Sequence, residues 1–184
     1  MNFKDLAAAR RSTRRYKKTS PIPREQLEIC VNSARLSPSA CNSQPWKFLV
    51  VDDPSLTKKI SGEVLSGAHK MNSFAAEASS FIAIVSENVK TTAWAGGKMM
   101  GTNFRLVDAG IACAHIVLQA EDLGIGSCIL GWFNEGRLKK LLSIPRRKKV
   151  KLLIALGYPE ERIRREKPLK PYSETVSFNT YDPT

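Results

Sequence analysis

The spacing of the apolar residues is the feature of this sequence that most constrains its fold. Residues 81–85 and 150–156 are apolar almost without interruption, which is typical of strands buried on both faces. Between them, apolar side chains recur every three or four positions over residues 103–123, which predicts a long helix. Because the stretch 109–120 is largely apolar, we expect this helix to be central. The pattern therefore predicts helices packed on a buried sheet.

Weaker patterns predict the other elements. Helices are expected over residues 3–10, 24–37 and 135–142 and from residue 54 onward, and strands over residues 46–51 and 127–132. Residues 86–102 contain three glycines and are expected to be irregular. Four prolines follow Gly157, which predicts an extended arm with at most one strand, at residues 175–178. The sequence thus predicts one helix-rich α+β domain with a three-layer α/β/α arrangement.

The composition excludes several kinds of site. The chain has two histidines, His69 and His115, and its four cysteines form no C-x-x-C pair, so neither a histidine-rich metal cage nor a zinc ribbon is expected. No apolar run approaches the ~20 residues that a membrane span needs. Arg10 and Arg11 interrupt the N-terminus too early for a secretory signal. We therefore expect a cytoplasmic protein with reduced thiols, no metal and no membrane partner.

The net charge of +12 indicates an anionic partner. Of the 29 lysines and arginines, 20 fall into residues 4–18, 137–151 and 162–170. Such blocks suit nucleic acid, an anionic membrane or a phosphorylated small molecule, and the first block also resembles a mitochondrial transit peptide. Charge by itself leaves these alternatives open. Nucleic acid is disfavoured because Tyr16 and Tyr172 are the only aromatic residues interleaved with the basic blocks.

Two polar motifs indicate where a phosphorylated ligand would bind. R-R-S-T-R-R-Y, at residues 10–16, offers guanidinium forks and a hydroxyl that match phosphate oxygens, although a solvated basic helix end explains it equally well. P-S-A-C-N-S-Q-P-W, at residues 38–46, places amides and hydroxyls directly before a predicted strand, as in many binding loops, and its alternative interpretation is a polar turn. Gly124 and Gly126 are no dinucleotide fingerprint, because they follow a helix and lead into a strand.

In their order and spacing, these motifs resemble the FMN-dependent nitroreductase family. The matching segments are R-R-S-x-R at 10–14, P-S-x-x-N-x-Q-P-W at 38–46, L-G-I-G-x-C-x-x-G at 123–131, A-L-G-Y-P at 155–159 and a basic stretch at 165–169. The resemblance implies a nitroreductase-like fold, with a central mixed sheet flanked by helices and a C-terminal arm exchanged in an obligate homodimer. Residues 1–184 would form one FMN-binding domain, with a basic flavin-binding segment (1–20), a candidate lid (86–102) and the extended arm (157–184).

The resemblance assigns the N-terminal motif to the flavin. Arg10 and Ser12 would hold the FMN phosphate, Arg11 the phosphate or the ribityl chain, and Arg14 the N1/O2 edge of the ring. The last role has a physical basis, because reduction builds negative charge at that edge and a fixed cation stabilises it.

The resemblance also implies that a second subunit completes each site. Pro38 and Ser39 of that subunit would lie against the ring, with Asn42 on its polar edge. The backbone N–H groups near Leu130 and Gly131 would approach flavin N5. No side chain would act as nucleophile or base, because FMN carries the redox chemistry.

Other assignments are less defined. The basic pair Arg165 and Lys167 would close on the phosphate. Lys70 and Asn72 are both candidates for a contact with the pyrimidine ring, and Trp94 either stacks over the flavin or lies on the surface or in the core. These alternatives stay open in the sequence.

The function that the resemblance implies is hydride transfer from NAD(P)H to tightly bound FMN, followed by reduction of a nitroaromatic or a quinone at the same ring. Two alternatives are a basic module that binds nucleic acid and a flavin-dependent dehalogenase on the same fold. The basic block at 137–151 is not explained by FMN. We favour a solvated face there over a surface that steers the phosphates of NAD(P)H.

Overall fold

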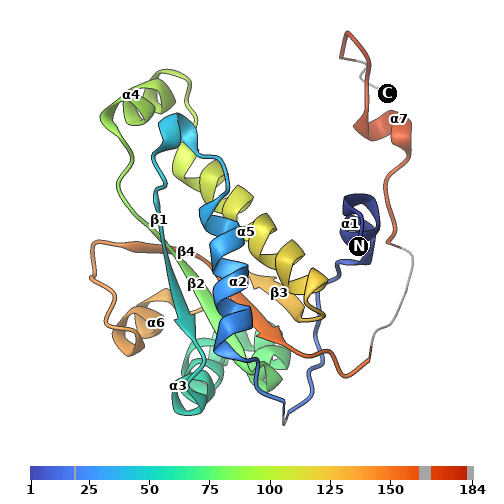
Figure 1. Cartoon of the computed structure of the whole chain (residues 1–184). Helices are drawn as coiled ribbons and strands as arrows, with labels where there is room; N and C mark the ends of the chain where they lie inside the picture. Colours follow the sequence, from blue (N-terminus) through green and yellow to red (C-terminus); the bar gives the residue numbers. More distant parts are fainter. Residues whose placement is uncertain (19, 162–166, 182–184) are drawn as a thin grey trace.

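The structure, a computed structural model, describes residues 1–18, 20–161 and 167–181 (Figure 1). The sheet has the strand order β1-β2-β4-β3, and each neighbouring pair is antiparallel. The strands are β1 at Trp46–Val51, β2 at Ser80–Ser86, β3 at Gly126–Leu130 and β4 at Lys149–Gly157. The expected mixed sheet is therefore wrong for these strands. The N-terminal segment adds one parallel contact to this sheet, a single bridge between Ser12 and Ser127. It does not extend into a parallel strand, because the segment then leaves β3 and hydrogen-bonds to Tyr158, after β4.

Helices fill the connections between the strands. The α-helices are α1 Phe3–Ala9, α2 Arg24–Arg35, α3 Pro54–Lys59, α4 Thr91–Met99, α5 Phe104–Asp122, α6 Glu135–Leu141 and α7 Tyr172–Thr175. The tighter or wider turns are the 3-10 helices η1 Ala40–Asn42 and η3 Gly67–Glu77 and the π-helical turn η2 Ile60–Val64. The predicted strand at 46–51 and the predicted long helix at 103–123 are confirmed. The segment η3 has no counterpart in the sequence prediction.

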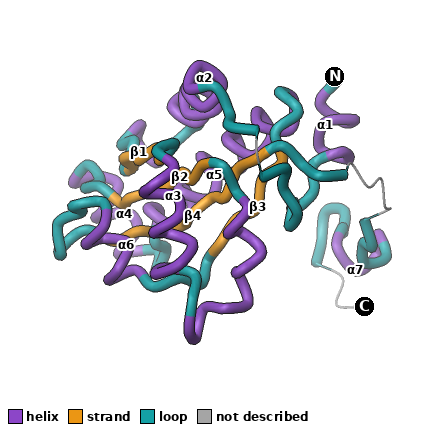
Figure 2. The backbone as a smooth tube through the Cα atoms, turned by 90° about the horizontal axis from the view of Figure 1, so that it is seen from below, coloured by secondary structure: helices purple, strands orange, loops and turns teal. Residues whose placement is uncertain are grey.

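Alternate residues of β2 face two separate cores, which explains why this strand is apolar throughout. Ile82 and Ile84 pack in one core with Leu27 of α2 and Ile116 of α5. Phe81 faces the other core, which contains residues of η2 and α6. Figure 2 shows the strands with α2 above them and α6 below. The α+β fold with three layers is confirmed. The expected central position of α5 holds for one of its faces, which is buried through residues such as Ile116, whereas Leu106 and Val107 are exposed.

Two local predictions are wrong. Residues 91–99 form the helix α4, although glycine costs about 1 kcal/mol relative to alanine in a helix. A Cβ on the buried Gly97 would lie 2.7 Å from the carbonyl oxygen of Thr102, so glycine allows α4 to pack on the start of α5. The second correction concerns residues 175–178. They form no strand, because this fully exposed stretch has no ladder partner, and α7 is a single helical turn at its start.

The N-terminal segment is fixed to the edge of the sheet by close backbone approach. The N–H of Thr13 donates to the Ser127 carbonyl at 2.8 Å, and the N–H of Lys17 donates to the Tyr158 carbonyl at 2.9 Å. Two glycines make room for it. A Cβ on Gly126 would lie 2.5 Å from Thr13 Oγ1, and a Cβ on Gly157 would lie 2.7 Å from Cδ1 of the buried Tyr16 ring.

Residues 167–181 of the C-terminal arm are exposed along their whole length and extend away from the sheet (Figure 1), whereas Gly157, at the start of the predicted arm, is buried as the last residue of β4. The exposed part carries large apolar side chains: Leu169, Tyr172, Val176, Phe178 and Tyr181. Among the described helices, none has both the length and the apolar character that crossing a membrane requires.

Candidate functional site

Three of the predicted phosphate and ring contacts, Arg10, Ser12 and Arg14, lie on the segment that runs beside β3. Ser12 forms a bridge with Ser127, the neighbour of Cys128. Burial raises the pKa of the Cys128 thiol, and the charges of Arg14 and Arg10, together with a hydrogen bond from Ser12, oppose the rise. Arg10 also acts on the buried Cys113 of α5, whose thiol pKa is raised to about 12 by burial. The cationic groups therefore gather where β3 meets α5.

Arg11 takes a different direction from its neighbours. Its guanidinium donates to the carbonyl oxygens of Ala8 and Arg10, at the C-terminal end of α1. A cation is favoured at that end of a helix. The structure thus places Arg11 at the helix terminus and leaves the other three residues of the motif grouped at Cys128.

The end of β3 forms the second part of the site. Leu130 is buried, whereas a Cβ on Gly131 would meet nothing within 4 Å, so space opens beside the backbone there. Trp132, the next residue, is 57% exposed, and its carbonyl accepts a hydrogen bond from Asn72 Nδ2 at 2.6 Å. Of the two open candidates, Asn72 rather than Lys70 makes this contact with the strand end.

The segment η3 also brings aromatic rings to this place, which the sequence did not indicate. The guanidinium carbon of Arg14 lies 5.7 Å from the centroid of the Phe74 ring. The rings of His69 and Trp132 meet edge to face at 6.2 Å. Neither Phe74 nor His69 lies in a recognisable motif. Trp132 directly follows the glycine of the third motif, and that position is the one sequence signal that could have drawn attention to it.

The loop with Pro38, Ser39 and Asn42 is tightly folded before β1. The Ser39 hydroxyl accepts from the N–H of Gln44 at 2.9 Å, and Asn42 Oδ1 accepts from Gln44 Nε2 at 3.1 Å. Cys41, Asn42 and Gln44 all have positive φ, at 52°, 49° and 47°. Left-handed backbone is favourable for glycine and tolerated by Asn, but it costs roughly 1–2 kcal/mol for other residues. The loop is therefore held in a strained shape.

A buried carboxylate, Asp108 on α5, supports this loop, and sequence reasoning missed it. It accepts from the N–H of Ala40 at 3.2 Å and is only 2% exposed. Burial raises the pKa of Asp108, while the hydrogen bond from Ala40 opposes that rise. Its carboxylate is buried among the apolar residues of α5, where the periodicity gave no reason to expect a role.

The two groups of predicted residues lie at opposite corners of the sheet. The N-terminal segment runs beside Ser127 of β3, which pairs with Leu156 near one end of β4. The loop leads into Trp46 of β1, at the opposite edge, whose partner Ser86 pairs with the far end of β4. From three strand spacings of about 4.8 Å and a rise of about 3.4 Å per residue along β4, the corners are roughly 25–30 Å apart. One chain does not bring them together.

The remaining predicted residues lie on the exposed parts of the chain. Lys167 is exposed on the C-terminal arm, and Arg165 lies outside the described residues. Trp94 is 53% exposed on α4, so the core interpretation of this residue is wrong.

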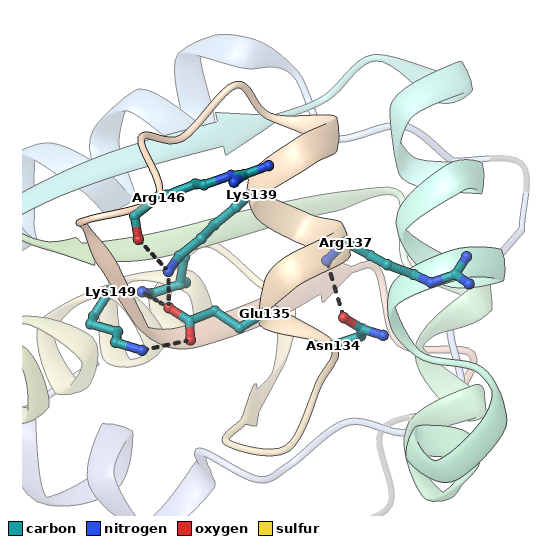
Figure 3. A network of polar contacts seen from close by, with 7 residues as sticks. Asn134, Glu135, Arg137, Lys139, Arg146 and Lys149 are labelled. Carbon is teal, nitrogen blue, oxygen red and sulfur yellow. Dashed lines mark hydrogen bonds and ion pairs between the residues drawn. The ribbon is translucent and has the colours of Figure 1, made fainter.

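The basic block at 137–151 forms a network of ion pairs (Figure 3). Glu135 pairs with Lys139 at 2.8 Å and with Lys149 at 3.6 Å, and it accepts from the N–H of Val150 at 2.9 Å. Burial would raise the pKa of Glu135, but the bond from Lys139, the Val150 N–H and the two lysine charges outweigh it and lower the pKa. Glu135 therefore ties α6 to β4 through Lys149 and the Val150 N–H. Arg137 and Lys148 of the same block pair with Glu63 and Glu87.

Known proteins resemble this chain over most of its length. The family model of the nitroreductase family matches residues 7–158. A protein of Archaeoglobus fulgidus with the provisional name NADH dehydrogenase/NAD(P)H nitroreductase is 35% identical over 156 residues, which cover 83% of this chain and 82% of that protein. An iodotyrosine deiodinase of Thermotoga neapolitana is 26% identical over 198 residues, which cover 96% of this chain and 97% of that protein.

Solved structures agree with this result. A nitroreductase family protein from Clostridium difficile 630 superposes with a TM-score of 0.78 at 26% identity, covering 98% of this chain and all of that one. An FMN-dependent nitroreductase from Clostridium difficile R20291 gives a TM-score of 0.74 at 26% identity, with 96% and 98% covered. Fold and sequence together define the class of this protein: an oxidoreductase with an α+β fold. The chain belongs to the nitroreductase family.

Proposed function

We propose that this protein is an FMN-dependent oxidoreductase that takes a hydride from NAD(P)H and reduces a small acceptor such as a nitroaromatic or a quinone. The observation that carries the proposal is the backbone pairing that holds the segment with Arg10, Ser12 and Arg14 beside β3, the strand that leads to the open space at Gly131. A nitroreductase relative that is FMN-dependent supports the choice of flavin, and a relative named for NADH and NAD(P)H supports the donor.

The residues at this place fit FMN. Guanidinium and hydroxyl donors suit the phosphate, which binds bidentately to arginine forks. The gap at Gly131, where a Cβ would meet nothing, leaves room for a flat ring beside the strand backbone. Bound FMN would supply the hydride-accepting ring, which no side chain of this site could replace.

The side chains of this site would bind the FMN phosphate and orient the flavin ring. Arg10 and Ser12 would hold the phosphate, and Arg14, steadied against the Phe74 ring, would present its charge to the edge of the flavin that gains electron density. Asn72 would fix the Trp132 carbonyl and, through it, the strand end at Gly131. No group of the site would need to abstract a proton.

The proposal includes a homodimer whose two sites lie at the interface. The corner that holds Pro38, Ser39 and Asn42 is too far from Arg10 to meet the same flavin within one chain. A second copy would supply that corner. Exposed apolar side chains support such an interface, on α5 (Leu106 and Val107) and on the C-terminal arm (Leu169, Tyr172 and Phe178). The arm would be exchanged, with Lys167 and Arg165 closing on the phosphate, and α4 with Trp94 would act as the lid.

The direct test is spectroscopic. The purified protein should carry flavin absorption bands, and NADPH or NADH added without oxygen should bleach them. Addition of a nitroaromatic compound to the reduced protein should then restore the flavin bands. A protein that remains colourless after incubation with FMN would overturn the proposal, and bands that no nicotinamide bleaches would overturn the choice of donor.

A second function is favoured by the deiodinase relative, which aligns over 96% of this chain. A reductive dehalogenase would use the same flavin site on a halogenated aromatic substrate. Release of iodide from iodotyrosine by the reduced protein would support it. Rapid reoxidation by nitroaromatics with no iodide release would leave the first function in place.

A further inference from the structure

A cavity of about 390 Å³ opens between α4 and the first turn of α5, and none of the predicted flavin contacts except the lid residue Trp94 lines it. Three of its lining side chains are cationic: Lys98, Arg105 and Lys151. None of the described lining residues is acidic, and none of the three cations forms an ion pair with a described residue. In this they differ from the lysines around Glu135, which form ion pairs with that carboxylate.

A β-bulge in β4 contains one of these cations, Lys151. Ile84 of β2 pairs with Leu152, and the next residue of β2, Val85, pairs with Val150, so Lys151 is the extra residue of a β-bulge. Bulges turn a side chain out of the regular alternation and are frequent next to functional sites. Lys151 is half-buried, between Val150 and Leu152 of β4, and lines the cavity.

Aromatic surface lies beside the charges. The Lys98 ammonium is 5.4 Å from the centroid of the Trp94 ring, and Trp94 is half exposed. The Phe104 ring forms another part of the lining, and it packs against Gly97, where a Cβ would lie 3.1 Å from its Cδ2. The cavity therefore combines flat apolar faces with three cations.

The cavity adjoins the loop that we propose to lie on the flavin ring. The N–H of Lys90, just before α4, approaches the hydroxyl of Ser43 in that loop at 3.3 Å. Asp108, one turn after Arg105 on α5, holds the loop through Ala40. Figure 1 shows α4 and the start of α5 together at the corner where α2 ends.

We propose that this cavity binds the anionic part of an aromatic ligand, with a carboxylate or phosphate held by Lys98, Arg105 and Lys151 and a ring stacked on Trp94 or Phe104. This rests on the proposed function, because it names the chemistry of the molecule that would enter the active site. The anion has two sources: a carboxylate on the acceptor or a phosphate of the nicotinamide donor.

The test measures binding to the purified protein in its oxidised form, without reductant, so that no turnover occurs. Calorimetry compares 4-nitrobenzoate with the neutral 4-nitrobenzyl alcohol, and adenosine 2′,5′-bisphosphate with adenosine. We expect one anion to bind about tenfold more tightly than its neutral partner, and added salt to reduce this preference. A preference for nitrobenzoate assigns the cavity to the acceptor, and a preference for the bisphosphate assigns it to the donor.

Variants link the preference to the cavity. Arg105→Gln and Lys151→Gln should each weaken binding of the preferred anion about threefold to tenfold, with little effect on the neutral compound. Lys98→Gln, on the exposed surface of α4, tests the same point should the half-buried positions affect folding. Lys140→Gln on α6 is the matched control, because Lys140 is exposed and does not line the cavity.

Two failures are distinguishable. Equal affinity for anions and neutral compounds, or a preference that Lys98→Gln, Arg105→Gln and Lys151→Gln all leave unchanged, overturns the inference even in a protein that holds flavin. A protein that shows no flavin bands after incubation with FMN overturns the proposed function. The calorimetric preference for the anion is measured separately and does not depend on flavin absorption.

Discussion

The two corners of the sheet are built in opposite ways. The N-terminal segment beside β3 is anchored by backbone hydrogen bonds and by two glycines that admit Thr13 and Tyr16 at close range. The corner before β1 is a strained loop with three residues at positive φ, next to a short helix and an open, positively charged cavity. In the proposed function, the first corner would hold the FMN phosphate, and the second would meet the flavin ring of the partner copy and admit the substrate beside it. An anchored segment and a strained loop can thus serve one proposed site in different ways.

The largest effect is expected at the anchored corner. Gly157→Ala places a Cβ 2.7 Å from the buried Tyr16 ring, which must shift together with the N-terminal segment. Overpacking of this kind costs about 2–3 kcal/mol in the free energy of unfolding. Urea denaturation at fixed protein concentration measures it, with Gly62→Ala as control because a Cβ there meets nothing within 4 Å. Equal stability of the two variants would mean that the segment is not anchored as described.

The next effect concerns ligand retention at the same corner. Arg10→Ala combined with Ser12→Ala should weaken FMN affinity about 30-fold or more, because two donors to a charged phosphate are lost. Quenching of free FMN fluorescence measures the affinity, and light scattering should show the same oligomer as the parent protein. Arg15→Ala, exposed and outside the group at Cys128, is the control. Unchanged FMN affinity in the double variant would show that the phosphate binds elsewhere.

A smaller effect, of opposite sign, is expected at the strained corner. Cys41 has φ 52°, and Asn adopts this backbone region more readily than Cys. Cys41→Asn should therefore stabilise the protein by about 0.5–1 kcal/mol, whereas Cys41→Ala should give no gain. Urea denaturation of the three proteins decides between them. A destabilised Cys41→Asn variant would contradict the idea that strain is stored in this loop.

The smallest effect is the pH dependence that Asp108 contributes to the same corner. Burial raises the pKa of Asp108 in the folded state, so the folded protein binds this proton more tightly than the unfolded chain. The stability from this group is present below the pKa of an unfolded aspartate and is lost as the pH rises through the raised folded value. Asp108→Asn, which keeps an oxygen for the Ala40 N–H, should be more stable than the parent at neutral pH, with the gain vanishing in acid. An identical gain at both pH values would exclude the titration of Asp108 as its cause.

Local sequence predicted most of the elements because their signals are local. The strand at residues 46–51 and the helix at 103–123 followed from apolar spacing alone. The helix α4 did not, because Gly96 and Gly97 lower helix propensity and only the close approach to Thr102 explains one of them. The segment η3 lacked a periodic pattern, and its contacts Asn72 and Phe74 were found through the fold.

The candidate site likewise has a part that the sequence predicted and a part that only the structure showed. The order of its motifs, read along the chain, identified the nitroreductase family and singled out Arg10, Ser12 and Arg14, which the structure brings together. The sequence could not show that Arg11 turns back to α1, because that depends on where the preceding helix ends.

The sequence by itself determined the fold class, the family and the basic, hydroxyl-bearing character of the N-terminal motif, because periodicity and motif order are properties of neighbouring residues. Tertiary structure alone decided that the two motif groups lie at opposite corners, and that Lys98, Arg105 and Lys151 share one cavity. The physical reason is that strand order, register and a single bulge at Lys151 bring together residues far apart in the chain. Those contacts follow from how the sheet pairs, and no local pattern records them.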